Sequence, residues 1–523
     1  MKSTFILIMF LSTIFFASCT KLNENVGANA TQGQVAKDSS YASILLQGVY
    51  SSLEWTFTSY LEIFPLSELT TDEAIAPTRG NNWDDNGQWR VLHQQKYDPN
   101  NVVIHDCFKS LSGVIYAATD MLQYKPTVQQ QAEARFLRAW AMYWLLDMYD
   151  QVPYRDPGES TVGPARVRRG MEALNYIISE VSDIEPHLHD EPGGRANKYA
   201  ARALLMKCYL NRGVYLSRTN LSFDPADMNM VISFADSIIL SGRFSLSKNY
   251  YDNFFPGNSG GSELIFTQMS NYDGNYFIAL SWLAVLSYPQ GGVNGFSTLP
   301  EFYDKFEPAD KRRGIVYDYP NSPVNSGRRQ NVGFLIGQQY DLSVDTPLTS
   351  LYSSSNPLPV IFTRDVQNTE PGPNIEMPGI RPVKYPPDYQ KFWPFLGPPS
   401  NEFVYLRFSD VLLMKAEAIL RGGTGTPAGI YGSDAVSIVN SIRTDPSRGA
   451  SPLPAVDTSV LLDERGRELW WENWRRQDLI RFGQFLKPFG PTKNYSSDSK
   501  YLLFPIPYEQ LGVNPNLAQN PGY

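Results

Sequence analysis

One stretch of the chain repeats apolar residues at helical spacing so regularly that it constrains the fold more than any other feature. It runs from residue 129 to residue 149 and reads QQQAEARFLRAWAMYWLLDMY. Its large apolar residues recur at the intervals expected for one wide face of an α-helix. Such a face has to be buried against neighbouring elements. The residues that form it are Phe136, Leu137, Trp140, Ala141, Trp144, Leu145 and Met148.

Similar periodicity predicts further helices along the chain. Short loops that contain Pro or Gly join several of them, which is typical of antiparallel helical pairs stacked into a solenoid. No strict 34-residue signature repeats, so the prediction depends on the rhythm of the helices alone. We therefore expect a mainly α fold: a tetratricopeptide-like scaffold of helical pairs with a large irregular region of loops and short strands packed on it. The additional helices are predicted at residues 106–124, 166–186, 196–215, 229–241, 409–420, 432–443 and 459–485.

The middle of the chain has a different character. Between about 245 and 400, Pro, Gly, Asn, Ser and Tyr dominate and are interrupted by short apolar runs such as Glu263-Leu264-Ile265-Phe266. This composition predicts loops with short strands, and long loops on a rigid scaffold usually carry the binding function. We therefore divide the body, residues 41–523, into three parts. These are helical pairs at about 41–244, a loop-rich ligand region at about 245–400, and C-terminal helices and a tail at about 401–523.

The first forty residues predict export and a lipid anchor. Lys2 precedes an almost unbroken apolar run at residues 5–16, which is typical of a signal peptide, here residues 1–18. The sequence FASC at residues 16–19 resembles a bacterial lipobox, and this resemblance implies that Cys19 becomes the acylated first residue of the mature protein. Residues 19–40 then form a polar, flexible tether between the anchor and the folded body.

Charge and motifs exclude several function classes. The formal net charge of -8 offers no basic surface to a nucleic-acid backbone. The HExxH, CxxC, GxSxG, Walker A and dinucleotide fingerprints are missing, so we predict no metal site and no cofactor. A structural calcium site built from scattered oxygen ligands would leave no such motif. We interpret His187-x-His189 as a loop after a helix, and Cys107 and Cys208 as ordinary buried thiols.

Three stretches of the sequence together resemble one family. They read AEARFLRAWAMYWLLDMYDQVPY at 132–154, YLRFSDVLLMKAEAIL at 405–420, and ERGRELWWENWRRQDLIRFGQF at 464–485, which is followed by the terminal FPIPYEQLGVNPNLAQNPGY. In this order they resemble the SusD/RagB family of outer-membrane lipoproteins. Asp150 and Asn473 stand where that family usually has Gly. Both residue types tolerate left-handed backbone geometry, so neither departure threatens the fold.

The resemblance implies a binding function and no catalysis. SusD-like proteins bind a nutrient outside the cell, most often an oligosaccharide, and act as the lid of a SusC-like, TonB-dependent barrel that imports it. This implies a lipid-anchored protein on the cell-surface side of the outer membrane, with no catalytic residues. We interpret the shared motifs themselves as scaffold. Glu472 and Arg476, for example, are four residues apart and would pair if one helix continued between them.

The best local candidate for ligand contact is the loop after Ser67–Glu73, where Thr-Asp-Glu resembles the family's own marker. An Arg, several amides and two Trp offer stacking planes beside groups that can form paired hydrogen bonds. Trp89 could instead open the next helix and be buried in the core. If Trp83 is the stacking platform, Trp83→Ala weakens binding at least tenfold and leaves thermal stability unchanged. The predicted contacts in this loop are Arg79, Asn81, Trp83 and Trp89.

A second group of aromatic residues lies in the loop-rich region. Trp282 is part of an apolar run, FIALSWLAVL, so packing in the core competes with ligand contact there. The predicted contacts of this group are Tyr272, Tyr276 and Trp282, with Tyr288 beside them and Trp393 as the next aromatic candidate.

Three other functions compete with glycan binding. Peptide capture, as in RagB-like relatives, keeps the architecture and changes the cargo, and the sequence does not separate the two. A surface glycoside hydrolase needs only two well-placed carboxylates, and 53 acidic residues leave such a pair open. A scaffold without a small ligand is disfavoured, because it has little use for a long aromatic loop region.

Overall fold

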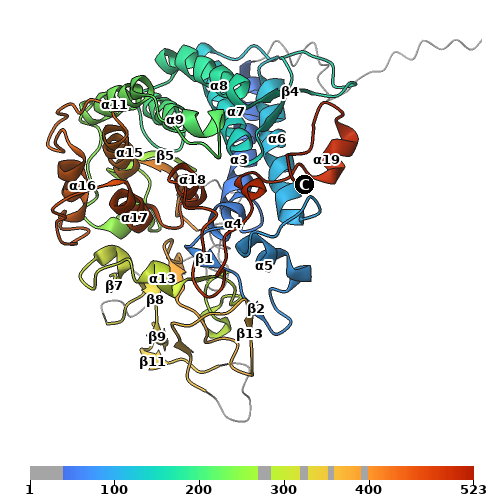
Figure 1. Cartoon of the computed structure of the whole chain (residues 1–523). Helices are drawn as coiled ribbons and strands as arrows, with labels where there is room; N and C mark the ends of the chain where they lie inside the picture. The colour runs from blue at the N-terminus through green and yellow to red at the C-terminus, as the bar shows by residue number, and fades with distance from the viewer. Residues whose placement is uncertain (1–38, 269–283, 319–327, 351–357, 390–398) are drawn as a thin grey trace, which may run out of the picture.

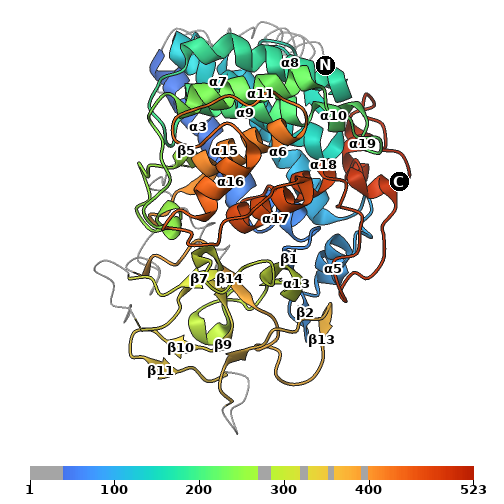
Figure 2. The same ribbon diagram turned by 60° about the vertical axis from the view of Figure 1, so that its left-hand side comes forward.

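The structure is a computed structural model that describes residues 39–268, 284–318, 328–350, 358–389 and 399–523. Figures 1 and 2 show two parts: α-helices gather in the upper part of the view, and short strands and loops from the middle of the chain form the lower part. The expected mainly α fold with an irregular region of loops and short strands is therefore confirmed.

Helices dominate the first half of the chain. They are α3 (Ser39–Thr58), α4 (Ile63–Glu68), α5 (Gln88–His93), α6 (Val102–Met121), α7 (Val128–Tyr149), α8 (Gly170–Ile184), α9 (Lys198–Leu210), α10 (Arg212–Leu216) and α11 (Pro225–Ile239). Helices close in sequence pack together, as the predicted pairs require: α6 on α7, α7 on α8 and α9 on α11. Two predicted bounds are corrected. Segment 166–186 becomes helical only at Gly170, because residues 166–169 form a strand, and segment 196–215 is divided at Asn211.

The C-terminal part adds helices that pack back onto the first half. They are α13 (Pro300–Tyr303), α15 (Phe408–Leu420), α16 (Ala435–Arg443), α17 (Thr458–Leu469), α18 (Arg475–Arg481) and α19 (Tyr508–Val513). α15 packs against α11, α16 and α17, and α18 packs against α4. The two ends of the described chain thus form one helical body, and the strand and loop region emerges from it (Figure 1).

The predicted helix at 459–485 is broken, and this corrects two expectations. Trp471 and Asn473 have positive φ angles of 58° and 69°, which separate α17 from α18. Glu472 and Arg476 therefore do not share a helix and do not pair. Glu472 binds Lys384 instead, and Arg476 donates to the carbonyl of Leu502 at 2.8 Å. The expected left-handed geometry at Asn473 is confirmed.

Local side-chain and backbone features mark both ends of α7. Thr127 and Gln130 form a reciprocal capping box at the start of α7. At the other end of this helix, Asp150 takes a left-handed conformation with φ of 60°, as expected for a residue in the place of Gly. The chain therefore turns sharply into the strand that follows α7.

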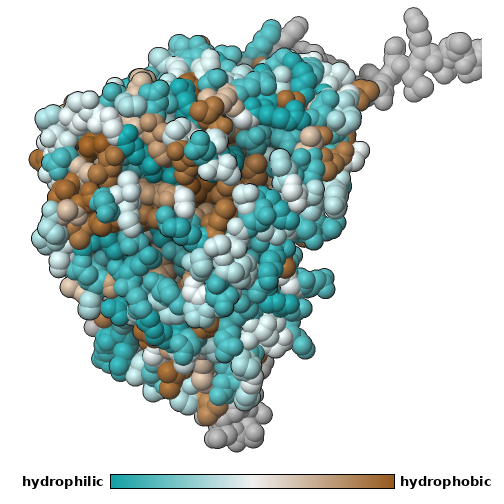
Figure 3. Space-filling model, in the orientation of Figure 1, coloured by the Kyte–Doolittle hydropathy of each residue, from teal (hydrophilic) through white to brown (hydrophobic). Residues whose placement is uncertain are grey.

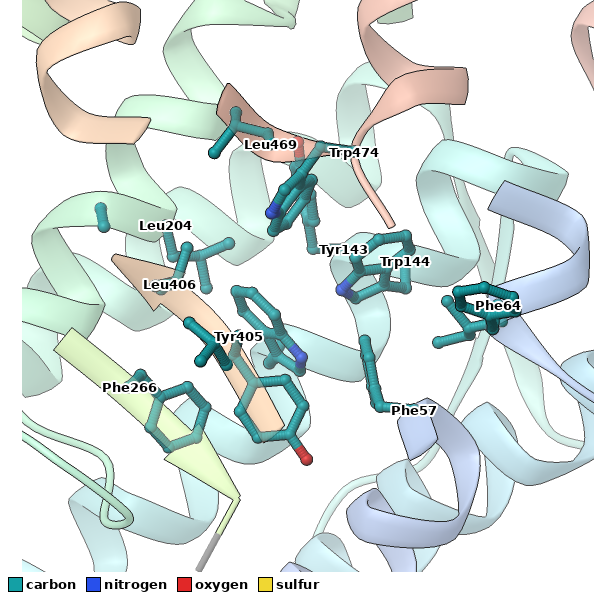
Figure 4. Close-up of a cluster of buried hydrophobic side chains, with 14 of the residues drawn as sticks. Phe57, Phe64, Tyr143, Trp144, Leu204, Phe266, Tyr405, Leu406, Leu469 and Trp474 are labelled. Carbon is teal, nitrogen blue, oxygen red and sulfur yellow. The ribbon is translucent and has the colours of Figure 1, made fainter. Parts of the chain in front are cut away.

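The centre of the helical body is rich in aromatic side chains (Figure 4). All seven residues of the predicted apolar face on α7 are buried. Trp140 lies within about 6 Å of the rings of Phe57, Phe266, Tyr405 and Trp474, mostly edge to face. Because these rings come from five separate elements of the chain, the cluster connects the first half of the body to its C-terminal part.

The strands are short and form small sheets. They are β1 (Ala74–Ile75), β2 (Thr78–Arg79), β3 (Gln151–Tyr154), β4 (Arg166–Arg169), β5 (Leu264–Gln268), β6 (Ser297–Thr298), β7 (Gly314–Ile315), β8 (Val332–Leu335), β9 (Gly337–Gln338), β10 (Tyr340–Asp341), β11 (Thr346–Pro347), β12 (Ile361–Phe362), β13 (Thr369–Glu370), β14 (Arg381–Val383) and β15 (Phe403–Arg407). β14, β8 and β7 make a three-stranded sheet, and the other pairs are β1–β6, β2–β13, β3–β4, β5–β15, β9–β12 and β10–β11. The predicted strand near Glu263–Phe266 is confirmed as β5.

A network of buried charges joins β5 and β15 to the C-terminal helices. Arg407 donates to Glu263 at 3.0 Å, to Glu468 at 2.6 Å and to Glu472 at 2.7 Å. Arg448 donates to Glu263 and to Glu468, each at 2.6 Å. All five side chains are at most 3% exposed. Buried charges are tolerated only when paired and hydrogen-bonded, so this network requires all of its members.

Glu54 on α3 is buried without such a partner. Its side chain is 8% exposed, and its Oε1 atom has no hydrogen-bond partner among the described residues. Burial raises the pKa of Glu54 to about 7. Since the folded pKa lies above the unfolded one, the associated stability is complete below about pH 4.5 and is lost as the pH rises through 7.

We therefore expect Glu54→Gln, which cannot ionise, to raise the free energy of unfolding at pH 8 by about 1–2 kcal/mol and to leave it unchanged at pH 4.5. Urea unfolding at the two pH values measures this difference. Glu172→Gln on the exposed surface of α8 is the control and should show no such dependence. A Glu54→Gln effect of the same size at both pH values would contradict the prediction.

Three further observations concern anchors, metals and thiols. Among the described residues, no helix combines the length and the apolar character that a membrane crossing requires. The described His, Cys, Asp and Glu side chains form no group of three or more that could hold a metal ion. Cys107 and Cys208 are free and buried, which confirms their interpretation as ordinary thiols.

Candidate ligand-binding pocket

A pocket with a volume of about 910 Å³ opens in the lower part of the molecule. Its walls come from β8, β9, the β10–β11 hairpin, the 3-10 turn Tyr288–Gln290 and the segment after β14, at residues within 286–291, 329–349 and 383–389. Of these elements, β9, β10 and β11 lie together at the bottom of Figure 2. The volume is at the upper end of the range typical of sites for small molecules. On the face shown in Figure 3, hydrophobic residues gather over the helical part, whereas the lower part is largely hydrophilic.

Three tyrosines line this pocket. Tyr288, Tyr340 and Tyr389 come from three separate segments, and each is half-buried. A tyrosine ring combines a flat apolar face with a hydroxyl at its edge. Rings of this kind suit ligands that alternate C–H surfaces with hydroxyl groups. Tyr288, which the sequence places beside the predicted aromatic contacts of the loop-rich region, lies in the pocket wall.

Amide side chains stand beside these rings. Gln290 Nε2 donates to Gln339 Oε1 at 3.3 Å, and Gln339 Nε2 donates to the carbonyl of Gly337 at 3.0 Å. Gln338 Nε2 donates to the backbone carbonyl of Gln339 at 2.7 Å. These bonds hold the amides in place, and each amide carries a donor and an acceptor side by side. Amides and hydroxyls of this wall match the hydrogen-bonding character of a ligand that carries hydroxyl groups.

Charge in the pocket is sparse. Among the lining residues that the structure describes, Arg329 and Asp341 are the charged ones. The hydroxyl and the backbone N–H of Ser343 donate to Asp341, and these bonds lower the pKa of its carboxyl below the ordinary value. A single lining carboxylate does not provide the pair that glycoside hydrolysis needs. The described wall is therefore suited to holding a polar ligand rather than cleaving it.

The loop at 79–89 does not line this pocket. Arg79 is fully buried and donates to the carbonyl of Ile375 and to Ser297 Oγ, both at 3.0 Å, and burial lowers its pKa to about 10. Trp89 is 1% exposed, and its Nε1 donates to Asp85 at 2.6 Å. Both side chains are therefore buried in this structure, and ligand contact by either of them stays a prediction.

Asn81 and Trp83 have different positions. Asn81 is exposed in the turn that follows β2 and does not line the described pocket. Trp83 is half-buried, with its ring 5.0 Å from that of Phe296, and its Nε1 donates to the carbonyl of Val293 at 2.8 Å. A Cβ atom added to Gly295 would lie 2.3 Å from the Trp83 ring, so the ring packs directly on the backbone there.

Trp83 thereby supports the segment that carries Tyr288. The backbone N–H of Asn294 donates to the carbonyl of Leu286 at 2.8 Å, and that of Gly292 donates to Ser287 at 3.0 Å. The segment at 284–296 is thus folded back on itself, and the Trp83 ring packs against its backbone at Val293 and Gly295. The predicted loop thus packs against a segment that contributes Tyr288 to the pocket wall, and none of its own residues lines that pocket.

Several predicted residues lie outside the described part of the chain. Tyr272, Tyr276, Trp282 and Trp393 are among them, as are Cys19 and most of the tether.

Tyr340, Tyr389, Gln338 and Gln339 line the pocket but were not predicted from the sequence. The signal that could have located Tyr340 and its neighbouring glutamines is the short polar stretch QQYDLSVDTP, in which a turn sequence separates two strand-like ends. Tyr389 has no comparable signal. This stretch lines a pocket only because the segments at 286–291 and 383–389, which are distant in sequence, fold against it.

A family comparison identifies the chain. Residues 251–523, which include the pocket and the C-terminal helices, match the model of the SusD family. The chain belongs to the SusD family. This confirms the resemblance in the three sequence stretches. The SusD family consists of binding proteins rather than enzymes, so the chain is a binding protein.

Relatives match this SusD-family chain over most of its length. The starch-binding protein SusD of Bacteroides thetaiotaomicron is 25% identical over 507 residues, which cover 89% of this chain and 86% of that protein. SusD-like protein P2 of Formosa agariphila is 24% identical and covers 100% of this chain and 99% of the relative.

Solved structures share the SusD fold. A SusD superfamily protein from Parabacteroides distasonis has a TM-score of 0.69 at 20% identity, and it covers 92% of this chain and 99% of its own. Surface glycan-binding protein A from Bacteroides thetaiotaomicron, in complex with laminarihexaose, has a TM-score of 0.68 at 17% identity with the same coverage. At these identities the likeness concerns the fold.

Proposed function

We propose that this SusD-family protein captures oligosaccharides at the cell surface in the pocket formed by residues within 286–291, 329–349 and 383–389. The observation that carries the proposal is the meeting of three tyrosine rings with held amides in one pocket of about 910 Å³. Sugars present C–H faces and adjacent hydroxyls, and rings and amides are complementary to these two features. A relative named as starch-binding, and a solved relative bound to laminarihexaose, support this choice of ligand.

The second part of the proposal concerns location and partner. We infer that Cys19 carries the lipid anchor and that residues 19–40 tether the body to the outer surface of the outer membrane. There the protein would act as the lid of a SusC-like, TonB-dependent barrel. A lid that covers a barrel mouth needs an interface larger than the standard of roughly 1,600 Å². Mild detergent extraction should therefore recover a large barrel protein with it, and repeated recovery of the chain alone would contradict the lid.

Tyr340→Ala and Tyr288→Ala are each expected to weaken oligosaccharide binding about tenfold, because each removes a ring face from the pocket wall. Calorimetric titration of the purified protein with a panel of oligosaccharides measures the affinity. Tyr340→Phe keeps the ring and should retain most of it. Tyr116→Ala on α6, where the ring is 54% exposed and remote from the pocket lining, is the matched control and should leave the affinity unchanged.

Three results would overturn the proposal in different ways. Binding of a peptide library without binding of any oligosaccharide would favour the peptide-capturing alternative. Release of reducing sugar by the purified protein would show a hydrolase. Full affinity in both Tyr340→Ala and Tyr288→Ala would place the ligand elsewhere on the molecule.

A further inference from the structure

At the rim of the pocket an ion-pair cluster joins the β10–β11 hairpin to the residues that precede β8. Asp345, in the turn of this hairpin, accepts from Arg329 at 3.1 Å and lies 3.5 Å from Arg328. The guanidinium of Arg329 lies over the ring of Tyr340, 3.9 Å from its centroid. Asp345 thus holds in place an arginine that covers part of a ligand-facing tyrosine.

The charged residues that the structure describes at this rim balance one another. Arg328 and Arg329 contribute two positive charges, and Asp341 and Asp345 contribute two negative charges. The other polar groups that line the described wall are amides, hydroxyls and backbone groups. Arg329 is therefore already engaged by a carboxylate and by an aromatic ring, and a second carboxylate, Asp341, stands on the same hairpin.

We propose that Asp345 sets the charge class of the cargo, so that the pocket selects uncharged oligosaccharides over those with uronic acid or sulfate groups. This inference rests on the proposed function and names its substrate class. An anionic sugar would have to displace Asp345 from Arg329 and would face repulsion from Asp341. An uncharged sugar meets neither penalty. Binding sites commonly gain specificity from charged groups that repel a competing ligand of the same charge.

Asp345→Asn tests this role without disturbing the turn. Asp345 has a positive φ of 56°, a conformation that Asn adopts at least as readily as Asp. The probes are a panel of uncharged hexasaccharides, including laminarihexaose, and hexagalacturonate as the anionic member, titrated by calorimetry at pH 7. The unaltered protein should bind its best uncharged hexasaccharide at least tenfold more tightly than hexagalacturonate.

In Asp345→Asn, the affinity for hexagalacturonate should rise about fivefold at low salt, as expected for one released charge near the ligand, and the gain should vanish at 1 M NaCl. The double variant Arg329→Gln/Asp345→Asn restores a neutral rim and should show no gain. Asp304→Asn is the matched control. It releases Arg364 from an ion pair outside the pocket lining and should leave every affinity unchanged.

The outcomes separate this inference from the proposed function. If hexagalacturonate is the tightest ligand of the unaltered protein, or if Asp345→Asn leaves its affinity unchanged, the selection by charge is wrong while glycan binding stands. If no hexasaccharide binds, the proposed function fails, and the inference fails with it.

Discussion

Arg407→Met is expected to lower the free energy of unfolding by about 3–5 kcal/mol, because it removes the shared partner of three buried carboxylates. Met fills most of the space of the arginine stem but supplies no charge and no donor. Glu263, Glu468 and Glu472 would then remain in an interior that excludes water, and burial strongly disfavours unpaired carboxylates. Urea or thermal unfolding of the purified variant measures the loss.

The pH dependence of this loss has a definite sign. Burial on its own raises the pKa of Glu468, but the guanidinium groups of Arg448, Arg407 and Arg312 outweigh it and hold the pKa well below its ordinary value. Without Arg407 the folded pKa rises, so protonation relieves the buried charge at a higher pH than in the unaltered protein. The deficit of Arg407→Met should therefore shrink as the pH falls from 8 towards 5.

Arg202→Met provides the matched control for Arg407→Met. Arg202 pairs with Glu185 at 2.7 Å on the partly exposed surface of α9, where ion pairs contribute little. We expect this change to alter stability by less than about 1 kcal/mol. Equal losses in the two variants would show that the buried network has no special role.

Trp83→Ala is expected to lower the free energy of unfolding by about 2–3 kcal/mol and to weaken ligand binding as well. Truncation of a packed Trp leaves a cavity, and the half-buried position of Trp83 places the effect below that of a fully buried one. The ring supports Val293 and Gly295, in the segment that carries Tyr288. Thermal unfolding and calorimetric titration of the same preparation measure the two losses.

The expected loss of stability in Trp83→Ala differs from the unchanged stability that was predicted from the sequence. Trp83→Phe separates the two interpretations, because it keeps an aromatic ring at this position while it removes the hydrogen bond to Val293 and the part of the indole that a phenyl ring does not fill. It should cost about 1 kcal/mol of stability and retain most of the binding. A large loss of affinity in Trp83→Ala with full stability would restore Trp83 as a direct ligand contact.

The helical scaffold could be predicted from the sequence because its signals are local. The apolar face of α7 repeats within a few residues, and its capping box and the left-handed Asp150 lie at its two ends. Such signals need no knowledge of distant partners. The break at Asn473 was harder to locate, since the carboxylates that bind its turn, Glu68 and Glu73, are about 400 residues away.

The candidate pocket could not be predicted in the same way. Trp83 and Trp89 are six residues apart in one loop, yet Trp89 is buried in the core and Trp83 supports the Tyr288 segment. Nothing in their immediate neighbours separates these environments. Tyr340 likewise has no local mark of a binding residue, because its role depends on Tyr288 and Tyr389, which reach the same pocket from elsewhere in the chain.

By itself, the sequence determined most of the helices, the family motifs and the change to an irregular middle region, because each depends on residues close together along the chain. Tertiary structure alone decided which aromatic rings face the pocket, which carboxylates share an arginine, and how Asp345 balances Arg329. Those outcomes depend on which segments meet in space. The contacts that bring them together are short-range in distance and long-range in sequence.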